Sequence, residues 1–205
     1  MDIIKLFPKV ISISYVDNCF DDDYKLLKNN YDMISIDRTS SDYSERSLNL
    51  TVLKDFPKLE LNLLEKFLQF NDQYLKHSSD FKITTSWITK TGKNQQSTIH
   101  SHKNSFYSGV LYFDDTINMN ETGKLELINM DTSEIFPGYL KEFNDYNSSI
   151  WSIFPQKNLI ILFPSNTFHK ISLHKSTIPR YSLAFNIFPV GDIGLSDSSL
   201  NIELK

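Results

Sequence analysis

From residue 82 onward, the apolar residues fall into short runs separated by turn-forming residues. Runs of this length predict β-strands. Eight segments share the pattern: Lys82–Lys90, Ser97–His102, Ser105–Phe113, Lys124–Ile128, Ser149–Phe154, Asn158–Phe163, Phe168–Leu173 and Arg180–Phe188. Strands at this spacing predict a sandwich or jelly roll. The one long irregular insert, residues 131–148, predicts a lid or a binding loop.

The first 80 residues follow other periods. Leucines and aromatic residues recur every three or four positions over Pro57–His77, which predicts an amphipathic helix packed on a sheet. Asp55 stands in its capping position, and Pro57 suits its first turn. Ahead of it, alternation over residues 10–16 predicts a strand. A short helix, capped by Asp17 or Asn18, is expected next and carries Phe20, Tyr24 and Leu27.

These patterns predict a single domain of residues 1–205. It comprises a supporting strand and helix region (1–80), a β-rich core (81–190) and a loosely ordered tail (191–205). A length of 205 residues suits one large β domain. Hydrophobic residues make up 40% of the chain and aromatic residues 13%, which excludes a disordered protein.

The charge balance and the cysteine count bear on partners and location. Lys and Arg total 21 against 25 Asp and Glu, a net charge of −4, which argues against a nucleic-acid binder. The single cysteine, Cys19, excludes an internal disulfide and favours a reducing compartment. The sequence suggests neither a signal peptide nor a membrane span, so we expect a cytoplasmic protein without a membrane partner.

Three histidines are candidates for metal chemistry. His100 and His102 are two residues apart, so on a strand both imidazoles point to one face and can converge. Imidazole is a common ligand of iron, zinc, copper and nickel. His169 opens the strand that follows the apolar run Leu159–Phe163. In a jelly roll, the chain path brings an early histidine pair and a single late histidine together.

The segment Arg180–Asn186 predicts the wall of a cavity. Its odd-numbered residues are apolar and predict a core face, whereas its even-numbered residues are polar or small. Arg180 can grip a carboxylate through two parallel hydrogen bonds, and Ser182 can add a third. The chain has only three arginines, which favours an anchoring role for this one over an exposed position.

Together these elements resemble a known family. The residues that carry the likeness are His100-x-His102, Ser108–Phe113, Leu162–Ser165 with His169, and Arg180-x-Ser182-x-Ala184-Phe185-Asn186. They resemble the 2-oxoglutarate/Fe(II)-dependent oxygenases, and more narrowly a small group from marine bacteria and their phages. Leu6-Phe7-Pro8 and Ser86–Thr89 also fit that group. A phage protein of this kind would work in the host cytoplasm.

The resemblance implies a mainly β fold with flanking helices, in which residues 81–190 form a double-stranded β-helix of the jelly-roll, cupin-like type. It also implies one Fe(II), with 2-oxoglutarate as cosubstrate and molecular oxygen as the oxidant. By the family motif, His100 is the first metal ligand and His169 the distal one. Arg180 and Ser182 match the R-x-S pair that holds the far carboxylate of 2-oxoglutarate.

Strand alternation adds further candidates. Asn104, Tyr112 and Asn186 are predicted to line the cavity, as contacts of the metal ligands or of the cosubstrate. The pair Ser108-Gly109 is interpreted as close strand packing and not as a phosphate cradle. His174, which follows the distal strand, is predicted to lie at the surface.

The sequence departs from the family where the motif expects Asp or Glu and this chain has His102. Three interpretations stay open: all three histidines bind iron; His102 binds while His100 supports it; or a carboxylate such as Asp114, Asp115 or Glu126 completes the site. We prefer the first, because the two-residue spacing already puts position 102 on the metal face. Without a carboxylate ligand, zinc or nickel in a purified sample would not be surprising.

The expected function is that of a 2-oxoglutarate-dependent dioxygenase that hydroxylates a small molecule or a protein side chain. Two alternatives remain: a cupin-type dioxygenase with a three-histidine iron site and no 2-oxoglutarate, and a non-enzymatic jelly-roll binding module. The Arg180-x-Ser182 pair favours the first function, because a cupin-type dioxygenase does not need it. Metal content after purification distinguishes the binding module.

Overall fold

The computed structural model describes residues 2, 4, 7–16, 20–36, 43–115, 118–130 and 138–203. The helices are α1 (Asp21–Asn29) and α2 (Pro57–Phe70). The strands are β1 (Ser12–Tyr15), β2 (Met33–Ser35), β3 (Glu45–Ser47), β4 (Asp80–Thr91), β5 (Tyr107–Tyr112), β6 (Leu125–Ile128), β7 (Ile150–Ile153), β8 (Leu159–Pro164), β9 (Phe168–Ile171), β10 (Arg180–Ile193) and β11 (Leu200–Ile202). Cys19 and the proposed caps Asp17 and Asn18 lie outside the described residues.

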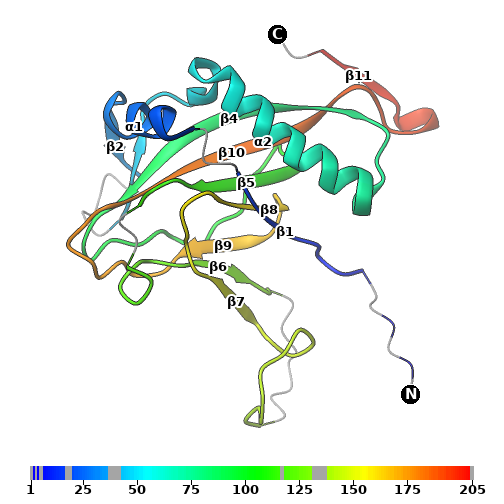
Figure 1. Ribbon diagram of the computed structural model, residues 1–205. Helices are drawn as coiled ribbons and strands as arrows, with labels where there is room; N and C mark the ends of the chain where they lie inside the picture. Colours follow the sequence, from blue (N-terminus) through cyan, green and yellow to red (C-terminus); the bar gives the residue numbers. More distant parts are fainter. Residues whose placement is uncertain are drawn as a thin grey trace.

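The strands form two antiparallel sheets (Figure 1). The larger sheet has the order β1-β8-β5-β10-β4-β3-β2, with β11 paired to β10, and the smaller one has the order β7-β6-β9. The smaller sheet lies on one side of the larger sheet, and α2 covers the other side. This arrangement is a double-stranded β-helix with flanking helices, which confirms the predicted fold class.

Alternation along the central strands builds two separate cores. In β5, Leu111 joins the cluster beneath the helices, whereas Val110 and Tyr112 join the cluster between the sheets. In β8, Ile160 and Ile161 divide in the same way. A strand buried on both faces reads as a continuous apolar run, which is why this part of the sequence shows little polar alternation.

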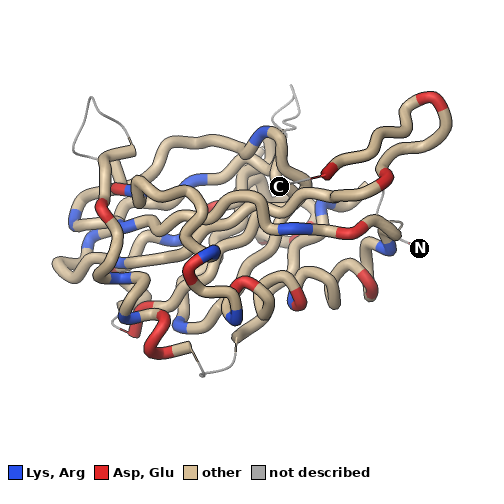
Figure 2. The backbone as a smooth tube through the Cα atoms, turned by 90° about the horizontal axis from the view of Figure 1, so that it is seen from above, with Lys and Arg blue, Asp and Glu red and all other residues tan. Residues whose placement is uncertain are grey.

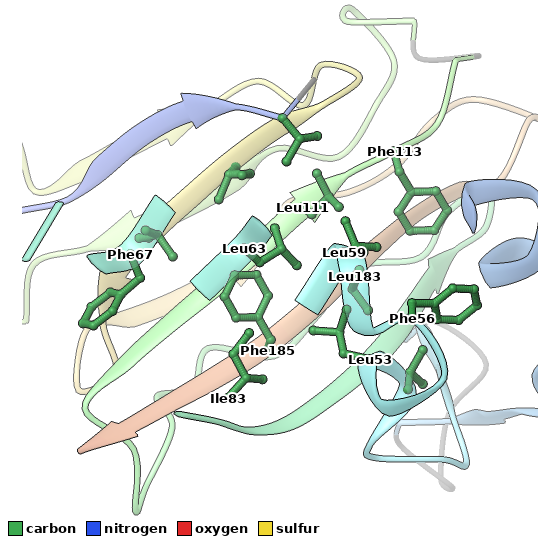
Figure 3. Close-up of a cluster of buried hydrophobic side chains, with 14 of the residues drawn as sticks. Leu53, Phe56, Leu59, Leu63, Phe67, Ile83, Leu111, Phe113, Leu183 and Phe185 are labelled. Atoms are coloured by element: carbon green, nitrogen blue, oxygen red, sulfur yellow. The ribbon is translucent and has the colours of Figure 1, made fainter. Parts of the chain in front are cut away.

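Helix α2 lies over the larger sheet and supplies much of the first core (Figure 3). Its buried side chains repeat at helical spacing, which confirms the predicted stripe: Leu59, Leu63, Phe67 and Phe70. The helix ends at Phe70 and not at His77. A π-helical turn over Asn71–Leu75 follows and ends where Lys76 takes a left-handed backbone with φ of 61°. Tyr74, predicted to continue the stripe, is therefore exposed.

Both helices begin without a side-chain cap. Phe56 occupies the N-cap position of α2, so the predicted cap Asp55 is wrong. The Asp55 carboxylate instead accepts a hydrogen bond from the Tyr31 hydroxyl at 2.7 Å. Helix α1 buries Tyr24 and Leu27 as predicted.

Two segments differ from the predicted strands. Residues 97–102 form no regular strand, and they contact β9 through an isolated bridge at His100 and hydrogen bonds between Ser97 and Ile171. The tail is more ordered than expected, because β10 continues to Ile193 and β11 pairs back onto it. The region before residue 80 also adds β1, β2 and β3 to the edges of the larger sheet.

Gly109 shows why β5 needs a glycine at its centre. A Cβ atom there would overlap the ring of Phe185 on β10, which is fully buried. The interpretation of Ser108-Gly109 as close strand packing is thus confirmed.

Basic and acidic residues are interspersed over the molecule (Figure 2). Within the described part of the chain, none of the helices combines the length and the hydrophobicity that crossing a membrane requires.

Candidate metal centre

Three histidines from two distant parts of the chain meet beside the smaller sheet. His169 lies in β9, and His100 pairs with it through two backbone hydrogen bonds of 3.0 and 2.9 Å. His102 follows two residues later, and its N–H donates to the Ser165 carbonyl at 2.9 Å. One ligand nitrogen from each imidazole lies within 4.8 Å of the other two. Among the described residues, this is the one cluster of at least three side chains suited to a metal ion.

Two of the imidazoles are oriented by backbone carbonyls. Nδ1 of His100 lies 2.9 Å from the Thr98 carbonyl, and Nδ1 of His169 lies 2.9 Å from the Thr167 carbonyl. A carbonyl only accepts, so each Nδ1 carries the proton and each Nε2 keeps its lone pair. Histidine metal ligands are typically held in this way.

His102 is oriented by side chains. Its Nδ1 lies 2.7 Å from Oδ1 of Asn186 and 2.8 Å from Oγ of Ser108. The Ser108 hydroxyl also donates to Asn186 Oδ1 at 2.8 Å. On its other side, Asn186 Nδ2 donates to the Thr85 hydroxyl at 2.9 Å, which sets the amide with its oxygen toward the imidazole. His102 therefore also carries its proton on Nδ1 and leaves Nε2 free for a metal.

Burial favours the neutral form of two of these imidazoles, His169 and His102. The pKa of His169 is lowered to about 3, mainly by burial and then by the nearby His100. Burial also lowers the pKa of His102, against the opposing effect of its hydrogen bond with Asn186. Metal binding requires neutral imidazole, so His169 and His102 favour the protonation state that a metal needs.

Glu126, one of the carboxylates considered as an alternative ligand, faces away from the cluster. In the register of β6 and β9, Leu127 lies opposite His169 and Glu126 lies opposite Lys170. Adjacent residues of a strand point to opposite faces. Glu126 and Lys170 accordingly pair at 3.4 Å on the far side of the smaller sheet.

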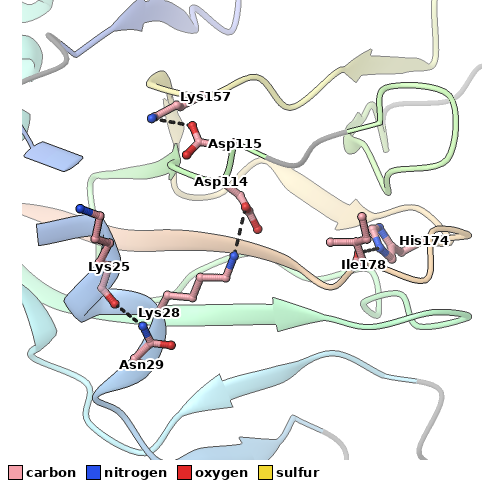
Figure 4. A network of polar contacts seen from close by, with 8 residues as sticks. All are labelled: Lys25, Lys28, Asn29, Asp114, Asp115, Lys157, His174 and Ile178. Atoms are coloured by element: carbon pink, nitrogen blue, oxygen red, sulfur yellow. Dashed lines mark hydrogen bonds and ion pairs between the residues drawn. The ribbon is translucent and has the colours of Figure 1, made fainter. Parts of the chain in front are cut away.

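The two aspartates considered as ligands are paired with lysines (Figure 4). Asp114 contacts Lys28 at 3.2 Å, and Asp115 contacts Lys157 at 2.5 Å. Neither belongs to the group of side chains that converges on one point. The described residues thus favour the three-histidine interpretation over one that adds a carboxylate.

Arg180 lies on the same face of β10 as Asn186 and is 2% exposed. Its Nη1 donates to the Gly123 carbonyl at 2.8 Å and its Nη2 to the Thr91 hydroxyl at 2.9 Å. Its Nε and the Tyr112 hydroxyl are buried, and the guanidinium and this hydroxyl lie close enough to affect each other's pKa; neither Nε nor the hydroxyl has a further hydrogen-bond partner among the described residues. Burial raises the pKa of Tyr112, so its hydroxyl keeps its proton. Unpaired buried donors are costly, and a carboxylate can accept from both.

The wall between Arg180 and Asn186 carries small side chains, Ser182 and Ala184. Ser182 is buried, whereas Ala184 and its partner in β4, Trp87, are only partly buried in the middle of the sheet. Partial exposure at such a central position means that other side chains do not fully cover this face. The arrangement supports the predicted cavity wall.

Asn104 lies where the chain turns away from the alternation that His102 begins. It is exposed and lies in the bend between His102 and β5, with a left-handed φ of 52°. The strand alternation from which its role was predicted stops at this bend.

A cavity of about 740 Å³ lies between the N-terminal segment and the start of β7, and its lining includes neighbours of His169 but none of the three histidines. Thr167, whose carbonyl holds His169, and Leu127, which pairs with His169, both line it. Other lining residues are Phe7, Lys9, Ile11, Asp145, Tyr146 and Trp151. Part of the predicted binding loop therefore borders this cavity, and residues 131–137 of that loop lie outside the described residues.

The sequence patterns did not reveal the hydroxyl groups behind His102. Ser108 Oγ lies 2.8 Å from Ser165 Oγ, which donates to Ser105 Oγ at 2.9 Å. The available signal was that Ser108, a polar residue, opens a run that is otherwise apolar.

His174 was predicted at the surface, and this is wrong. The residue is 1% exposed. Its burial is tolerated because both ring nitrogens form hydrogen bonds, Nδ1 with the Gly123 N–H at 3.2 Å and Nε2 with the Ile178 carbonyl at 2.9 Å (Figure 4). Both partners come from loops, which strand patterns do not place.

The fold and the convergent imidazoles define a double-stranded β-helix protein with a candidate metal centre. Several crystal structures share the fold. An oxidoreductase of the 2OG-Fe(II) oxygenase family from Burkholderia pseudomallei matches with a TM-score of 0.62 and 11% identity, over 86% of this chain and 84% of that one. A Pseudomonas putida prolyl-4-hydroxylase matches with a TM-score of 0.57 and 11% identity, over 87% of this chain and 92% of that one. HygX from Streptomyces hygroscopicus, with nickel, 2-oxoglutarate and hygromycin B bound, matches with a TM-score of 0.54 and 12% identity, over 88% of this chain and 83% of that one.

The family is identified from the sequence. The family model described as "Putative 2OG-Fe(II) oxygenase" matches residues 85–186, a span that contains the three histidines and Arg180. A search of curated proteins found no match. The chain belongs to the 2-oxoglutarate/Fe(II) oxygenase family, which is named for its use of Fe(II) and 2-oxoglutarate.

Proposed function

We propose that this oxygenase is a hydroxylase whose iron(II) is held by Nε2 of His100, His102 and His169. The observation that carries the proposal is the common arrangement of the three rings, each with Nδ1 hydrogen-bonded and Nε2 left for a shared ligand. When bound, iron(II) and 2-oxoglutarate supply the oxidation: oxygen is activated as 2-oxoglutarate loses carbon dioxide. The chain itself supplies binding, orientation and shelter from water.

Arg180 and Tyr112 are proposed to bind the far carboxylate of 2-oxoglutarate. Two hydrogen bonds already fix the guanidinium, and the buried Nε and the Tyr112 hydroxyl have N–H and O–H donors to offer. Hydrogen bonds between such donors and a carboxylate are among the strong ones in proteins. Ser182 lies between Arg180 and the histidines on the same strand face and can donate a further bond.

The substrate is proposed to enter through the cavity beside His169. Its walls combine aromatic side chains with one lysine and one aspartate, Lys9 and Asp145. A small molecule or a protein side chain that carries a C–H bond for hydroxylation suits this lining. We infer a cytoplasmic enzyme from the single cysteine, and a phage origin from the resemblance to a group found in marine bacteria and their phages, which a composition with one alanine and three arginines suits.

A cupin-type dioxygenase that does not use 2-oxoglutarate is the second candidate, because His102 stands where a carboxylate is usual. The buried Arg180 argues against it, since that chemistry has no use for a guanidinium with free donors.

An anaerobic titration with Fe(II) and 2-oxoglutarate tests the proposal. The wild-type protein is expected to develop the weak visible charge-transfer band of the metal chelate, and only when both components are present. The His169→Ala variant should show neither the band nor bound iron. Iron binding without the band would favour the cupin-type candidate, and iron bound stoichiometrically to His169→Ala would overturn the ligand assignment.

A further inference from the structure

A second buried histidine lies behind Arg180, and Gly123 connects the two. The Gly123 carbonyl accepts from Arg180 Nη1 at 2.8 Å, and the Gly123 N–H donates to Nδ1 of His174 at 3.2 Å. Since Nδ1 of His174 accepts, its proton is on Nε2, which donates to the Ile178 carbonyl at 2.9 Å. His174 therefore bridges two loops, one of which contacts the guanidinium.

The position of Gly123, between Arg180 and His174, is closely restricted by its neighbours. A Cβ atom on Gly123 would overlap the carbonyl oxygen of Ser172 just after β9. Lys124 and Ser172 also exchange two hydrogen bonds of 2.9 Å, one through each backbone N–H. The Gly123 carbonyl is thus held from one side by packing on Ser172 and from the other by His174.

We propose that His174 is a positioning residue for the cosubstrate: through Gly123 it fixes the guanidinium of Arg180 in the orientation that receives 2-oxoglutarate. This inference rests on the proposed role of Arg180 as the carboxylate anchor. An arginine side chain has large rotational freedom, and fixing it in advance lowers the entropy that binding must offset. Two hydrogen bonds orient the Nη groups of Arg180, one to Gly123 and one to Thr91, so loss of the first leaves the bond to Thr91 and packing over the Tyr112 ring.

The ring must be neutral for this role, and its surroundings keep it so. Burial lowers the pKa of His174, and the charge of Arg180 lowers it further, while the hydrogen bond with the Ile178 carbonyl and the charge of Glu121 oppose the shift without cancelling it. A neutral Nδ1 can accept from Gly123, whereas a protonated one cannot.

Two amide variants separate the two ends of the bridge. In His174→Asn, the side-chain oxygen stands near the position of Nδ1 and can accept from Gly123, but the bond to Ile178 is lost. In His174→Gln, the side-chain amide reaches the position of Nε2 and can donate to Ile178, but the bond to Gly123 is lost. The two variants therefore differ in the one contact that leads to Arg180.

The experiment measures the dissociation constants of iron(II) and 2-oxoglutarate anaerobically in both variants, with Arg180→Ala as the reference for a lost anchor. We expect iron binding within about twofold of wild type in both. For 2-oxoglutarate we expect about three- to tenfold weaker binding in His174→Gln, since one hydrogen bond is worth this much, and about twofold or less in His174→Asn. Leu59→Val, in the core under α2, is the control for a loss of stability alone.

The possible failures are distinguishable. If Arg180→Ala binds 2-oxoglutarate like wild type, the anchor assignment fails and the role of His174 fails with it. If Arg180→Ala loses 2-oxoglutarate but His174→Gln does not, the anchor stands and the positioning role is overturned. Equal weakening in both amide variants, or in Leu59→Val as well, would mean that His174 contributes stability only.

Discussion

The hydrogen bonds behind His102 give the sharpest prediction about metal affinity. Replacing Asn186 with leucine, which has almost the same shape, removes the acceptor at 2.7 Å from Nδ1 of His102. The Ser108 hydroxyl remains 2.8 Å from the same nitrogen and can still accept. Removing a hydrogen-bond partner of a metal-binding histidine typically weakens metal binding by about 10- to 100-fold. Because His102 keeps one of its two partners, we expect the lower end of this range, about tenfold weaker binding or ~1.4 kcal/mol.

Two further variants test the reasoning. Asn186→Leu combined with Ser108→Ala leaves Nδ1 of His102 without an acceptor, and we expect about 100-fold weaker binding. Asn186→Asp keeps an acceptor and makes it more basic, so affinity should equal or exceed that of wild type. Thr85→Val removes only the distant partner of Asn186, at 2.9 Å, and is the matched control, with an expected change of less than about threefold.

The assay is anaerobic titration of the metal-free protein with Fe(II), with Ni(II) as a second probe, alongside thermal unfolding to confirm folding. Asn186→Leu and Asn186→Asp must differ, because they differ in the acceptor and barely in shape. Equal affinities in these two variants would show that His102 is not a ligand oriented by Asn186, and would favour an arrangement in which His102 does not bind the metal.

Three other changes have defined outcomes. Arg180→Ala should weaken the binding of 2-oxoglutarate by about 10- to 100-fold, because the charge-assisted bond from Nε is lost, while iron affinity changes little. Isothermal titration measures both affinities, and equal losses would indicate misfolding. Gly109→Ala should lower the free energy of unfolding, measured by urea denaturation, by about 1–3 kcal/mol, because the new Cβ atom overlaps the ring of Phe185. Adding Phe185→Leu should recover part of this loss. An unchanged free energy of unfolding in Gly109→Ala would contradict the close packing of these two residues. The pKa of His169 is about 3 in the folded state, below the unfolded value of 6.5. The metal-free protein should therefore lose stability as the pH falls from about 6.5 toward 3, and the loss from this group should approach ~1.4 kcal/mol per pH unit. The His169→Gln variant should lack this part of the pH dependence of the free energy of unfolding.

The strand pattern predicted the sheets well because hydrophobicity along a strand depends on burial, which the sequence records directly. The pattern was less successful where hydrogen bonds, and not burial, determine the path of the backbone. The segment around His100 was predicted as a strand, yet its N–H groups donate to two different partners, β9 and the Ser165 carbonyl. Such divided pairing leaves no periodic trace in the sequence.

The candidate site shows the same limit. The histidines and Arg180 could be predicted, because their residue types carry the chemistry. Asn104 could not be judged from alternation, since its left-handed backbone redirects the chain. The burial of His174 depends on Gly123 and Ile178, whose positions follow from loop geometry and not from any local pattern.

The missing carboxylate changes the electrostatics of the whole site. Three neutral imidazoles bring no negative charge to the metal, and the acidic side chains considered as ligands are paired with lysines. The buried cation Arg180 adds a positive charge on the same strand face. A doubly negative 2-oxoglutarate is then the natural charge partner of both the metal and Arg180. Metal and cosubstrate should therefore strengthen each other's binding, and by linkage they must do so by the same factor. In an enzyme with a carboxylate ligand, part of that mutual stabilisation is already supplied by the protein, so the histidine at position 102 makes retention of the metal more dependent on 2-oxoglutarate.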